Sequence, residues 1–303
     1  MADVVLKNIS KTYNKGTVQA VQDVSFSVDK GELFGLIGPD GAGKTSIFRM
    51  LTTLLLPDAG TASVNGHDIV KDYKTIRNEV GYMPGKFSLY QDLTVEENLD
   101  FFATVFNTCI EQNYEMIKDI YVQIEPFKER RAGKLSGGMK QKLALCCALI
   151  HKPSVLFLDE PTTGVDVVSR REFWEMLKGL KEQGITILVS TPYMDEATLC
   201  DRIALIQAGK ILSIDTPDGI VKQYTEQLYA VKAVEMNRLL RELRGNQHIN
   251  KCFAFGEYLH VSFKEQENFE YLLKELQEKK FTSPEIKKIE PTIEDCFINL
   301  MRS

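Results

Sequence analysis

The feature that most constrains this chain is a glycine-rich segment between a short apolar run and a helical pattern. The apolar run is 33–37 (Leu-Phe-Gly-Leu-Ile), and the segment that follows it reads Gly38, Pro39, Asp40, Gly41, Ala42, Gly43, Lys44 and Thr45. The spacing G-x-x-x-x-G-K-T after a strand and before a helix is typical of a loop that cradles phosphates. Its glycines let main-chain N–H groups turn toward phosphate oxygens, and the start of the helix attracts the same anion. The sequence therefore predicts a nucleoside-triphosphate site rather than an incidental glycine-rich turn.

Three side chains at the end of this phosphate loop (38–45) have expected roles. Lys44 is placed to reach the β- and γ-phosphates, and the hydroxyl of Thr45 is placed to ligate Mg²⁺. Ser46 adds a second hydroxyl at the phosphates. These residues predict a site for a nucleoside triphosphate with Mg²⁺ as its cofactor.

A pair of carboxylates supports the same site. Val155–Leu158 is a compact apolar run that ends in Asp159 and Glu160. In parallel sheets the carboxyl ends of strands form the edge where ligands bind. We expect Asp159 to hold Mg²⁺ through water and Glu160 to act as the general base that polarises the attacking water. The alternative is that Asp-Glu-Pro only ends a strand.

Length and composition narrow the class of protein. The chain has 303 residues, which favours two domains. Its formal net charge is −5, which argues against broad nucleic-acid binding. The cysteines lack Cys-x-x-Cys spacing and the histidines are scattered, so neither predicts a metal cluster. No apolar leader is visible, and the longest apolar run, Leu143–Ile150, is far shorter than the roughly 20 residues that span a bilayer. Any membrane role is therefore expected to come through a partner.

Hydrophobic patterning predicts an α/β chain. Short apolar strands at 33–37, 154–158, 185–190 and 203–207 alternate with helical patterns, which predicts a parallel sheet covered on both faces. Strands are also expected at 4–9 and 23–28, and helices at 95–106 and 113–125 within a helical insertion of about 86–150. After Pro217 the order strand, helix, hairpin, helix, strand, helix is ferredoxin-like with one added helix. Its elements are expected at 228–234, 236–245, 249–255, 257–263, 266–279, 285–289 and 292–301. We predict domains at 1–218 and 219–303.

With these motifs, a third segment carries a family resemblance. Leu135, Ser136, Gly137, Gly138 and Met139 lie in the helical insertion. Together with the phosphate loop and the acidic pair, they resemble the ATP-binding subunit of ABC-type transporters over residues 1 to about 220. The tail 290–297 (Glu-Pro-Thr-Ile-Glu-Asp-Cys-Phe) is similar to the daunorubicin-resistance-like, multidrug-exporter branch. The resemblance implies a P-loop NTPase (RecA-like) sheet core with an antiparallel β subdomain, and a ferredoxin-like accessory domain at the C-terminus.

The resemblance also implies roles for single residues. Tyr13 matches the aromatic residue that stacks on adenine, and Asp166 lies in the dimer-interface loop. Two subunits would clamp two ATP molecules, with Ser136, Gly137, Gly138 and Met139 of one facing the phosphate loop of the other. ATP binding and hydrolysis would then close and open the dimer and drive a membrane permease. Such a subunit is cytoplasmic and peripheral on the inner face of the cell membrane. The expected dock for the permease is the segment Phe87–Tyr90, for which an ordinary apolar core contact is the alternative.

Two positions depart from the family pattern. After Gly81-Tyr82-Met83-Pro84, relatives carry a glutamine that reaches the metal and the attacking water, whereas this chain has Gly85. After strand 185–190, relatives carry a histidine that contacts the γ-phosphate, whereas this chain has Pro192, which offers no donor. We expect the chain to bind Mg-ATP and to hydrolyse it slowly. A second ATP-binding subunit with an intact glutamine and histidine would complete a heterodimer, and a slow homodimer is the alternative.

Other interpretations stay open at this point. The alternatives are a nucleotide-gated regulatory or structural subunit with little hydrolysis, and a soluble non-transport ABC-type ATPase that acts on ribosomes or DNA. The adjacent Arg170 and Arg171 are expected to be solvated helix charges. Arg238, Arg241 and Arg244 recur on one helical face, which predicts a solvated face or, alternatively, a docking surface.

Overall fold

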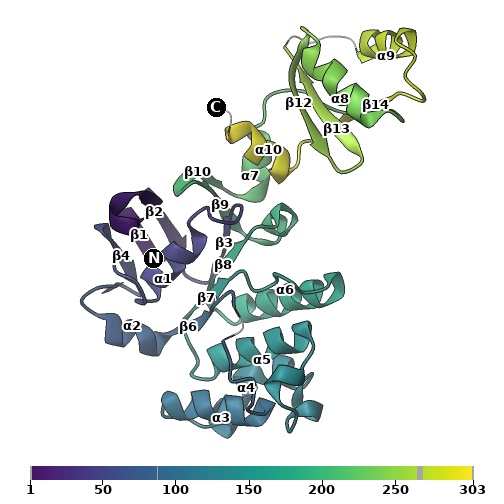
Figure 1. Cartoon of the computed structure of the whole chain (residues 1–303). Coiled ribbons are helices and arrows are strands. Elements are labelled where there is room, and N and C mark those ends of the chain that lie inside the picture. Colours follow the sequence, from purple (N-terminus) through teal and green to yellow (C-terminus); the bar gives the residue numbers. More distant parts are fainter. Residues whose placement is uncertain (1, 87, 265–268, 302–303) are drawn as a thin grey trace. The chain divides into compact units, whose positions relative to one another are not determined.

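The computed structural model describes residues 2–86, 88–264 and 269–301. Within them the chain divides into two compact units, Met1–Asp218 and Gly219–Ser303, each described by itself below. Figure 1 shows the elements of both units in chain order.

A six-stranded sheet forms the centre of the first unit. Its strands, from edge to edge, are β10 (Lys210–Asp215), β9 (Arg202–Gln207), β3 (Leu33–Ile37), β8 (Thr186–Thr191), β7 (Val155–Asp159) and β6 (Val80–Met83). All neighbours pair in parallel except β10, which is antiparallel to β9. Every residue of β3, β7 and β8 is buried, as the near-continuous apolar runs predicted. The carboxyl ends of these three strands therefore lie side by side at one edge of the sheet.

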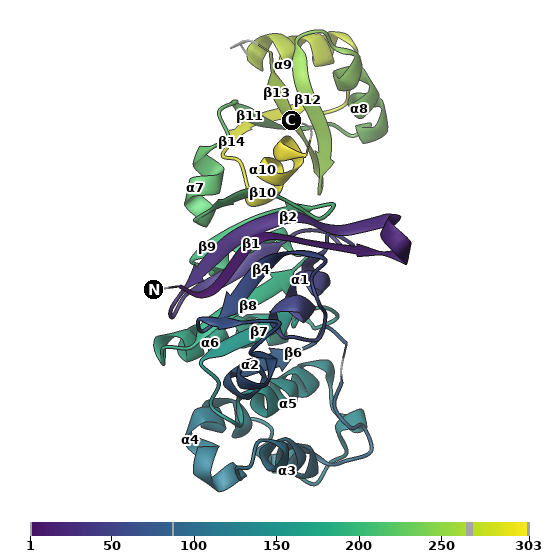
Figure 2. The same cartoon turned by 90° about the vertical axis from the view of Figure 1, so that its left-hand side faces the viewer.

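A second, antiparallel sheet belongs to the same unit (Figure 2). Its order is β2 (Val18–Asp29), β1 (Ala2–Tyr13), β4 (Ala59–Val64) and β5 (His67–Asp68). The strands expected at 4–9 and 23–28 are present but longer, since β1 and β2 continue to a tight turn at Asn14–Gly16. That turn places Lys15 in the left-handed region at φ 55°. The long β1 brings Tyr13 to the same end of the unit as the phosphate loop.

Helices surround the central sheet. Their bounds are α1 (Lys44–Leu51), α2 (Tyr73–Glu79), α3 (Val95–Val105), α4 (Ile110–Tyr121), α5 (Gly137–Leu149) and α6 (Val167–Glu182). The short α7 (Pro217–Lys222) crosses the boundary between the two units. A helix at 113–125 was predicted, but α4 starts earlier and ends at Tyr121. Beyond Val122 the chain enters a 3-10 turn at Glu125–Phe127, and Pro126 in that turn has no N–H with which to continue the α-helical hydrogen bonds. Across the described residues, no helix combines the length and apolarity that crossing a membrane requires.

The helical insertion consists of α3, α4 and α5, which gather beyond the β6 edge of the sheet (Figure 1). The helix expected at 95–106 is α3, and its start is fixed by a capping box between Thr94 and Glu97. Between residues 88 and 150 the structure has no named strand, as the loss of strand signal predicted.

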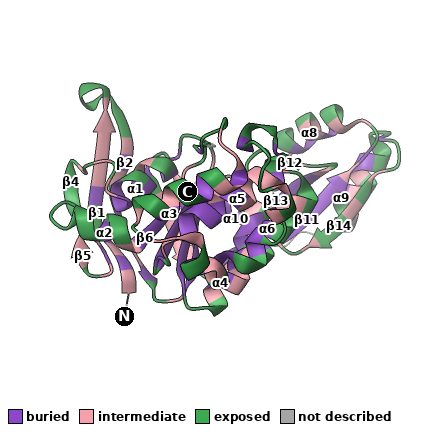
Figure 3. Ribbon diagram, turned by 90° about the horizontal axis from the view of Figure 1, so that it is seen from below, coloured by how far each residue is buried: buried purple, intermediate pink, exposed green. Residues whose placement is uncertain are grey.

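The core of the first unit lies between the two sheets and α1. Phe26 and Phe34 stack with ring centroids 5.2 Å apart, and Phe48 meets Phe157 edge-on at 6.0 Å. Figure 3 shows the buried strands at the centre with exposed loops and helix faces around them. This packing fixes the strand ends from which the phosphate loop and the acidic pair project.

The second unit has the ferredoxin-like order that the sequence predicted. Its elements are β11 (Leu228–Lys232), α8 (Met236–Gly245), β12 (Ile249–Phe255), β13 (Tyr258–Phe263), α9 (Phe269–Glu278), β14 (Glu285–Ile289) and α10 (Ile293–Leu300). The antiparallel sheet runs β12-β13-β11-β14, and α8 and α9 contribute to one core with it. The predicted start of the second helix, 266–268, lies outside the described residues.

A buried pair between a histidine and a carboxylate stabilises this second unit. His260 Nδ1 lies 2.6 Å from Asp295 Oδ1, and both residues are buried. Asp295 also closes the capping box at the start of α10 with Thr292. On α8, Arg238, Arg241 and Arg244 are all exposed, as the prediction of a solvated face expected. Arg238 also lies 4.3 Å from the ring of Phe281 and donates to the carbonyl of Lys279.

Candidate nucleotide-binding site

The phosphate loop connects the buried end of β3 to the start of α1, as predicted. A Cβ at Gly38 would lie 2.2 Å from the carbonyl oxygen of Ile206, so only glycine fits there. Gly43 is the N-cap of α1 at φ 106°, and a Cβ would lie 2.3 Å from the carbonyl oxygen of Ala20. The loop is therefore held closely between β9 and β2, with the first turn of α1 directly behind it.

Lys44 is a buried cation with several oxygen partners. Its Nζ donates to the carbonyl oxygens of Gly38 at 2.7 Å and Pro39 at 3.0 Å. It also lies 3.0 Å from Oε1 of Glu160, and only 2% of the lysine side chain is exposed. The predicted phosphate ligand and the predicted general base therefore meet in this structure. A phosphate at Lys44 would have to replace the Glu160 carboxylate.

The acidic pair is held by the neighbouring strand. β7 and β8 pair in register, with Asp159 opposite Ser190. The Ser190 hydroxyl donates to Asp159 Oδ1 at 2.6 Å, and it accepts from the Glu160 N–H at 3.0 Å. Burial raises the pKa of Asp159, and hydrogen bonds from Ser190 and Thr45 oppose that rise. The two carboxylates thus have different environments, one buried and one paired with Lys44.

The donor set fits a magnesium ion. Thr45 and Asp159 offer oxygen atoms within hydrogen-bonding reach of each other, and Mg²⁺ prefers few protein oxygens together with phosphates and water. Within the described ranges, no group of three or more His, Cys, Asp or Glu residues is arranged to hold a metal on its own. A metal here would therefore bind together with the nucleotide rather than in a protein cage.

Tyr13 lies beside the first turn of α1. Its hydroxyl is 3.1 Å from the Ser46 hydroxyl, and both residues are half-buried. The structure therefore brings Tyr13, predicted for the base, next to Ser46, predicted for the phosphates. Their roles toward a nucleotide stay predictions.

The two departures from the family pattern lie at the site itself. A Cβ at Gly85 would be 3.0 Å from the Asp159 carbonyl oxygen and 3.8 Å from Glu160 Cβ. Pro192 follows Thr191, whose carbonyl accepts the Gly38 N–H at 3.2 Å. Nearby Tyr82 does not substitute as an acid or base, because burial and the Asp159 charge raise its pKa to about 12. Positions 85 and 192 are therefore adjacent to the acidic pair and to the phosphate loop, and neither supplies a polar side chain.

The elements predicted to act on a partner's nucleotide form a second exposed group. Ser136 is the N-cap of α5, where its hydroxyl accepts from the Met139 N–H at 3.3 Å, and Ser136 and Gly137 are exposed. Gly138 is buried against α6, since a Cβ there would lie 2.6 Å from the Ser169 hydroxyl. Asp166 caps α6 by accepting from Val168 and Ser169 at 3.1 and 3.0 Å. These hydrogen bonds lower the pKa of Asp166, so it is a stable anion beside an open helix terminus.

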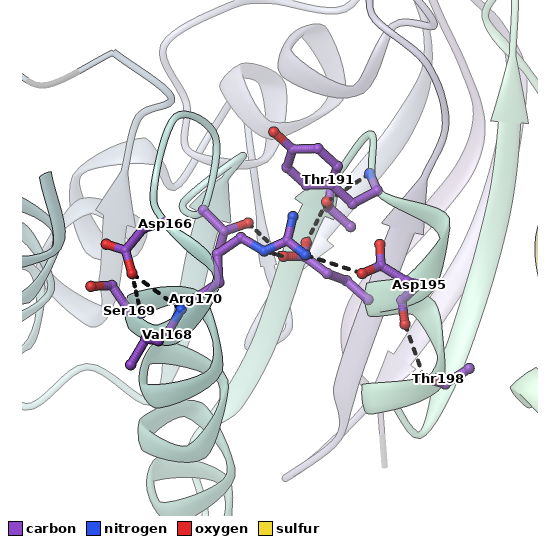
Figure 4. Close-up of polar contacts among 10 residues, drawn as sticks. Asp166, Val168, Ser169, Arg170, Thr191, Asp195 and Thr198 are labelled. Carbon is purple, nitrogen blue, oxygen red and sulfur yellow. Dashed lines mark hydrogen bonds and ion pairs between the residues drawn. The ribbon is translucent and has the colours of Figure 1, made fainter. Parts of the chain in front are cut away.

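Sequence reasoning missed a network that supports the site. Arg170 was expected to be a solvated charge, which is wrong: its side chain is only 21% exposed and extends from the start of α6 toward Asp195 (Figure 4). Glu196, 2% exposed, accepts from the hydroxyls of Thr162 and Thr191. The signal available in the sequence was the polar Ser-Thr end of an otherwise apolar strand, which in a parallel sheet must meet the acidic end of its neighbour.

The expected permease dock borders a cavity. Phe87 lies outside the described residues, Leu89 is buried, and Ser88 and Tyr90 are exposed. Ser88 and Leu89 line a cavity of about 420 Å³ between the insertion and the sheet edge. Its other walls are largely apolar, including Leu54, Tyr82, Met83, Phe102, Val105 and Phe106.

The parallel sheet, the phosphate loop and the acidic pair define the class as a P-loop nucleotide-binding domain. A family model described as "ABC transporter" matches residues 21–163. The chain is 43% identical over 219 residues to the probable multidrug ABC transporter ATP-binding protein YbhF of Escherichia coli, a match that covers 72% of this chain and 38% of YbhF. It is 38% identical over 225 residues to the Nod factor export ATP-binding protein I of Burkholderia lata, covering 73% of each chain. It is also 38% identical over 220 residues to the doxorubicin resistance ATP-binding protein DrrA of Mycobacterium tuberculosis, covering 72% of this chain and 66% of DrrA.

Solved structures agree with these relatives. An ATP-binding subunit of an ABC transporter superposes with a TM-score of 0.66 at 28% identity, covering 73% of this chain and 92% of that one. The dimeric bacterial ABC transporter cassette MJ0796 superposes with a TM-score of 0.64 at 25% identity, covering 70% and 98%. The chain therefore belongs to the ABC transporter family, among its ATP-binding proteins, and its fold is that of the ABC cassettes.

Proposed function

We propose that the chain is the ATP-binding and ATP-hydrolysing subunit of a membrane exporter, and that its own site turns over slowly. The observation that supports it most is the meeting of Lys44 and Glu160 at 3.0 Å behind the phosphate loop. The relatives named for multidrug transport, Nod factor export and doxorubicin resistance favour export of a drug or another hydrophobic substrate.

The residues of the site have complementary tasks in this proposal. The terminal phosphates of ATP displace Glu160 from Lys44, and the phosphate-loop N–H groups bind the same oxygens. Glu160, once released, accepts the proton of the attacking water. Thr45 would hold Mg²⁺ directly and Asp159 would hold it through water, and the ion would supply positive charge against the negative charge that develops on the phosphates. Ser190 keeps both carboxylates oriented through its two hydrogen bonds.

The slow turnover follows from positions 85 and 192. Neither Gly85 nor Pro192 has a side chain that orients water or contacts the γ-phosphate. The loss of one positioned group of this kind typically costs on the order of 10²–10³ in rate. ATP binding is maintained, since Lys44 and the loop N–H groups do not depend on either position.

Steady-state ATPase measurements on the purified chain test this. We expect Pro192→His to raise kcat by about 10-fold or more, and Pro192→His with Gly85→Gln to raise it further. Pro126→His, an exposed proline outside the site, is the matched control and is expected to leave the rate unchanged. Brisk hydrolysis by the unmodified chain that neither substitution alters would refute the slow-site proposal.

The same departures favour a second candidate, a nucleotide-gated regulatory subunit. In that case Mg-ATP binds with micromolar-range affinity, but Pro192→His and the double variant do not hydrolyse it. Calorimetric titration with Mg-ATP, with Lys44→Ala as the binding-deficient control, separates a subunit that binds without turnover from a chain that does not bind.

We further propose two kinds of protein partner. A membrane permease would dock an apolar segment in the cavity beside Ser88 and Leu89. A second ATP-binding subunit, preferably a different one with an intact glutamine and histidine, would use Ser136, Gly137 and Gly138 of this chain. Purification from detergent-solubilised membranes is expected to recover a permease, and Leu54→Asp at the cavity wall is expected to weaken that recovery. Recovery of ribosomes instead would favour the non-transport ATPase.

A further inference from the structure

A continuous path of hydrogen bonds leads away from the phosphate loop at Thr191. This residue is fully buried at the end of β8. Its carbonyl accepts the Gly38 N–H at 3.2 Å, so it is tied to the first residue of the phosphate loop. Its hydroxyl donates to Glu196 at 2.5 Å and accepts the Tyr193 N–H at 3.0 Å. Thr191 therefore connects the loop to the segment that follows Pro192.

Glu196 carries the path across to the interface loop. Its carboxylate also accepts from the Thr162 hydroxyl at 2.8 Å and lies 3.7 Å from Nε of Arg170. A buried carboxylate is stable only when such partners satisfy it. Each partner here comes from a different segment: the end of β8, the start of the loop to Asp166, and the first turns of α6.

Arg170 completes the path at α6. Its Nη2 pairs with Asp195 at 3.0 Å, and its guanidinium lies 4.6 Å from the ring centroid of Tyr193. The main-chain N–H of Arg170 donates to the carbonyl of Asp166 at 2.9 Å, as the first turn of α6 requires. Arginine suits this position because its planar fork can stack on a ring and bind two carboxylates at once. Figure 4 shows Asp166 and Arg170 on the same end of α6, with Asp195 on the facing turn.

The first turns of α6 also contact the signature helix α5. Gly138 packs directly on Ser169, and Lys142 Nζ lies 2.7 Å from Glu172. The loop around Asp166 and the exposed start of α5 at Ser136–Gly137 therefore both contact the first turns of α6. Glu196 connects these turns to the phosphate loop through Thr191.

We propose that Arg170 and Glu196 are positioning residues that couple nucleotide occupancy of the phosphate loop to the loop around Asp166. This inference rests on the proposed function, because it takes ATP as the ligand of the loop. When phosphates pull on the Gly38 segment, Thr191 and Glu196 shift with it, and Arg170 passes the shift to α6. In a chain whose own site turns over slowly, this path lets bound ATP arrange the residues that serve a partner.

Hydrogen–deuterium exchange of the full-length chain tests the proposal. The ligand is a non-hydrolysable ATP analogue with Mg²⁺, at a protein concentration where sedimentation shows single copies, so that dimer formation does not protect the interface. Peptides covering 38–46 report binding, and peptides covering 162–169 report the coupling. In the wild type we expect the ligand to slow exchange in both.

Arg170→Ala is expected to keep the protection at 38–46 and to reduce the ligand response at 162–169 by about 10-fold, within the usual range of coupling between sites. Glu196 keeps its two threonine partners in this variant, so the fold should persist. Arg170→Lys is expected to restore the response only in part. Arg171→Ala, the exposed neighbour, is the matched control and should behave as wild type.

The outcomes are separable. Two results overturn this inference and leave the proposed function intact. In the first, the ligand protects 38–46 of the wild type but does not slow exchange at 162–169. In the second, the ligand slows exchange at 162–169 as much in Arg170→Ala as in the wild type. Absence of protection at 38–46 in the wild type overturns the proposed function and this inference with it. If Arg170→Ala does not fold, Glu196→Gln, which removes the charge without changing the shape, makes the same test.

Discussion

The hydroxyl of Ser190 offers a direct measure of how the buried carboxylate is stabilised. Ser190 is fully buried, and its hydroxyl donates to Asp159 Oδ1 at 2.6 Å. It also accepts the Glu160 N–H, which has a second acceptor in the Ser190 carbonyl at 3.1 Å. Ser190→Ala therefore removes one bond to a charged group and leaves the Glu160 N–H satisfied. A hydrogen bond to a charged group contributes about 1.5–3 kcal/mol, which is the expected loss in free energy of unfolding near neutral pH.

The loss is expected to depend on pH. Burial raises the pKa of Asp159 above its ordinary value of 3.8, so ionisation of this group destabilises the folded state. The stability that the Asp159 carboxyl contributes to the fold is complete at pH values below its ordinary pKa, and it is lost as the pH rises through the raised pKa of the folded state. Without Ser190 that pKa rises further. At low pH the protonated carboxyl makes only a neutral bond to Ser190, and the cost of Ser190→Ala falls to about 1 kcal/mol.

Urea unfolding followed by tryptophan fluorescence makes the measurement. Trp174 is the chain's single tryptophan and is buried in α6, so its emission reports the first unit. Unfolding is measured near neutral pH and again below about 3.8, the ordinary value for the group, where the Asp159 carboxyl is protonated in the folded state. Thr52→Val is the control, because Thr52 is buried and donates to a neutral carbonyl of Phe48 at 2.8 Å. An equal loss for Ser190→Ala at both pH values, matching that of Thr52→Val, would refute the reasoning.

Two further predictions concern the phosphate loop and the second unit. Gly38→Ala is expected to reduce Mg-ATP affinity by at least about 10-fold and to destabilise the first unit by about 1–3 kcal/mol, because its Cβ would lie 2.2 Å from the Ile206 carbonyl. Gly41 has φ 77° but open space around it, so Gly41→Ala is expected to lower the free energy of unfolding by only about 1 kcal/mol. Titration calorimetry and urea unfolding compare the two glycine variants. Asp295→Asn is expected to destabilise the second unit by about 3 kcal/mol, because it breaks a buried pair with His260. The pKa of Asp295 is lowered, since hydrogen bonds from His260 and Thr292 outweigh the effect of burial. The stability that ionised Asp295 contributes is therefore present above the ordinary pKa of an aspartate and is lost as pH falls through the pKa in the folded state. Hydrogen exchange of the amides in 249–263 at two pH values measures the loss caused by Asp295→Asn. A loss that does not become smaller in acid would contradict the prediction.

The elements that the sequence predicted well are those whose signal is local. The phosphate loop, the apolar strands ending at Ile37 and Asp159, and the ferredoxin-like order each depend on residues close together in the chain. The edge strands β6 and β10 and the short β5 were not identified from periodicity, because their burial comes from neighbours far along the chain. The bounds of α4 were wrong for a related reason, since helix ends depend on caps and on turns that precede Pro126.

Only the residues of the candidate site that belong to sequence motifs were predictable. Gly38, Lys44, Asp159 and Glu160 belong to motifs whose spacing is itself the signal. Ser190 acts on Asp159 and Glu160, which lie 31 and 30 positions away, and Glu196 joins Thr191 to Thr162, which lies 34 positions from it. The register of β7 on β8 had to be known before Ser190 could be assigned. Arg170 has the sequence context of an exposed helical charge, and the carboxylates that capture it follow Pro192, at the end of another strand.

The pairing of Lys44 with Glu160 has a consequence for how the chain responds to its ionic surroundings. An incoming triphosphate exchanges one anion for another on a lysine that is already neutralised, so few counterions change place. We therefore expect nucleotide affinity to vary only weakly with salt concentration. At a site where the lysine is unpaired and solvated, the affinity would vary more strongly. In the proposed function, the same exchange releases the Glu160 carboxylate from Lys44 only when a substrate has arrived, so the resting chain keeps that carboxylate paired.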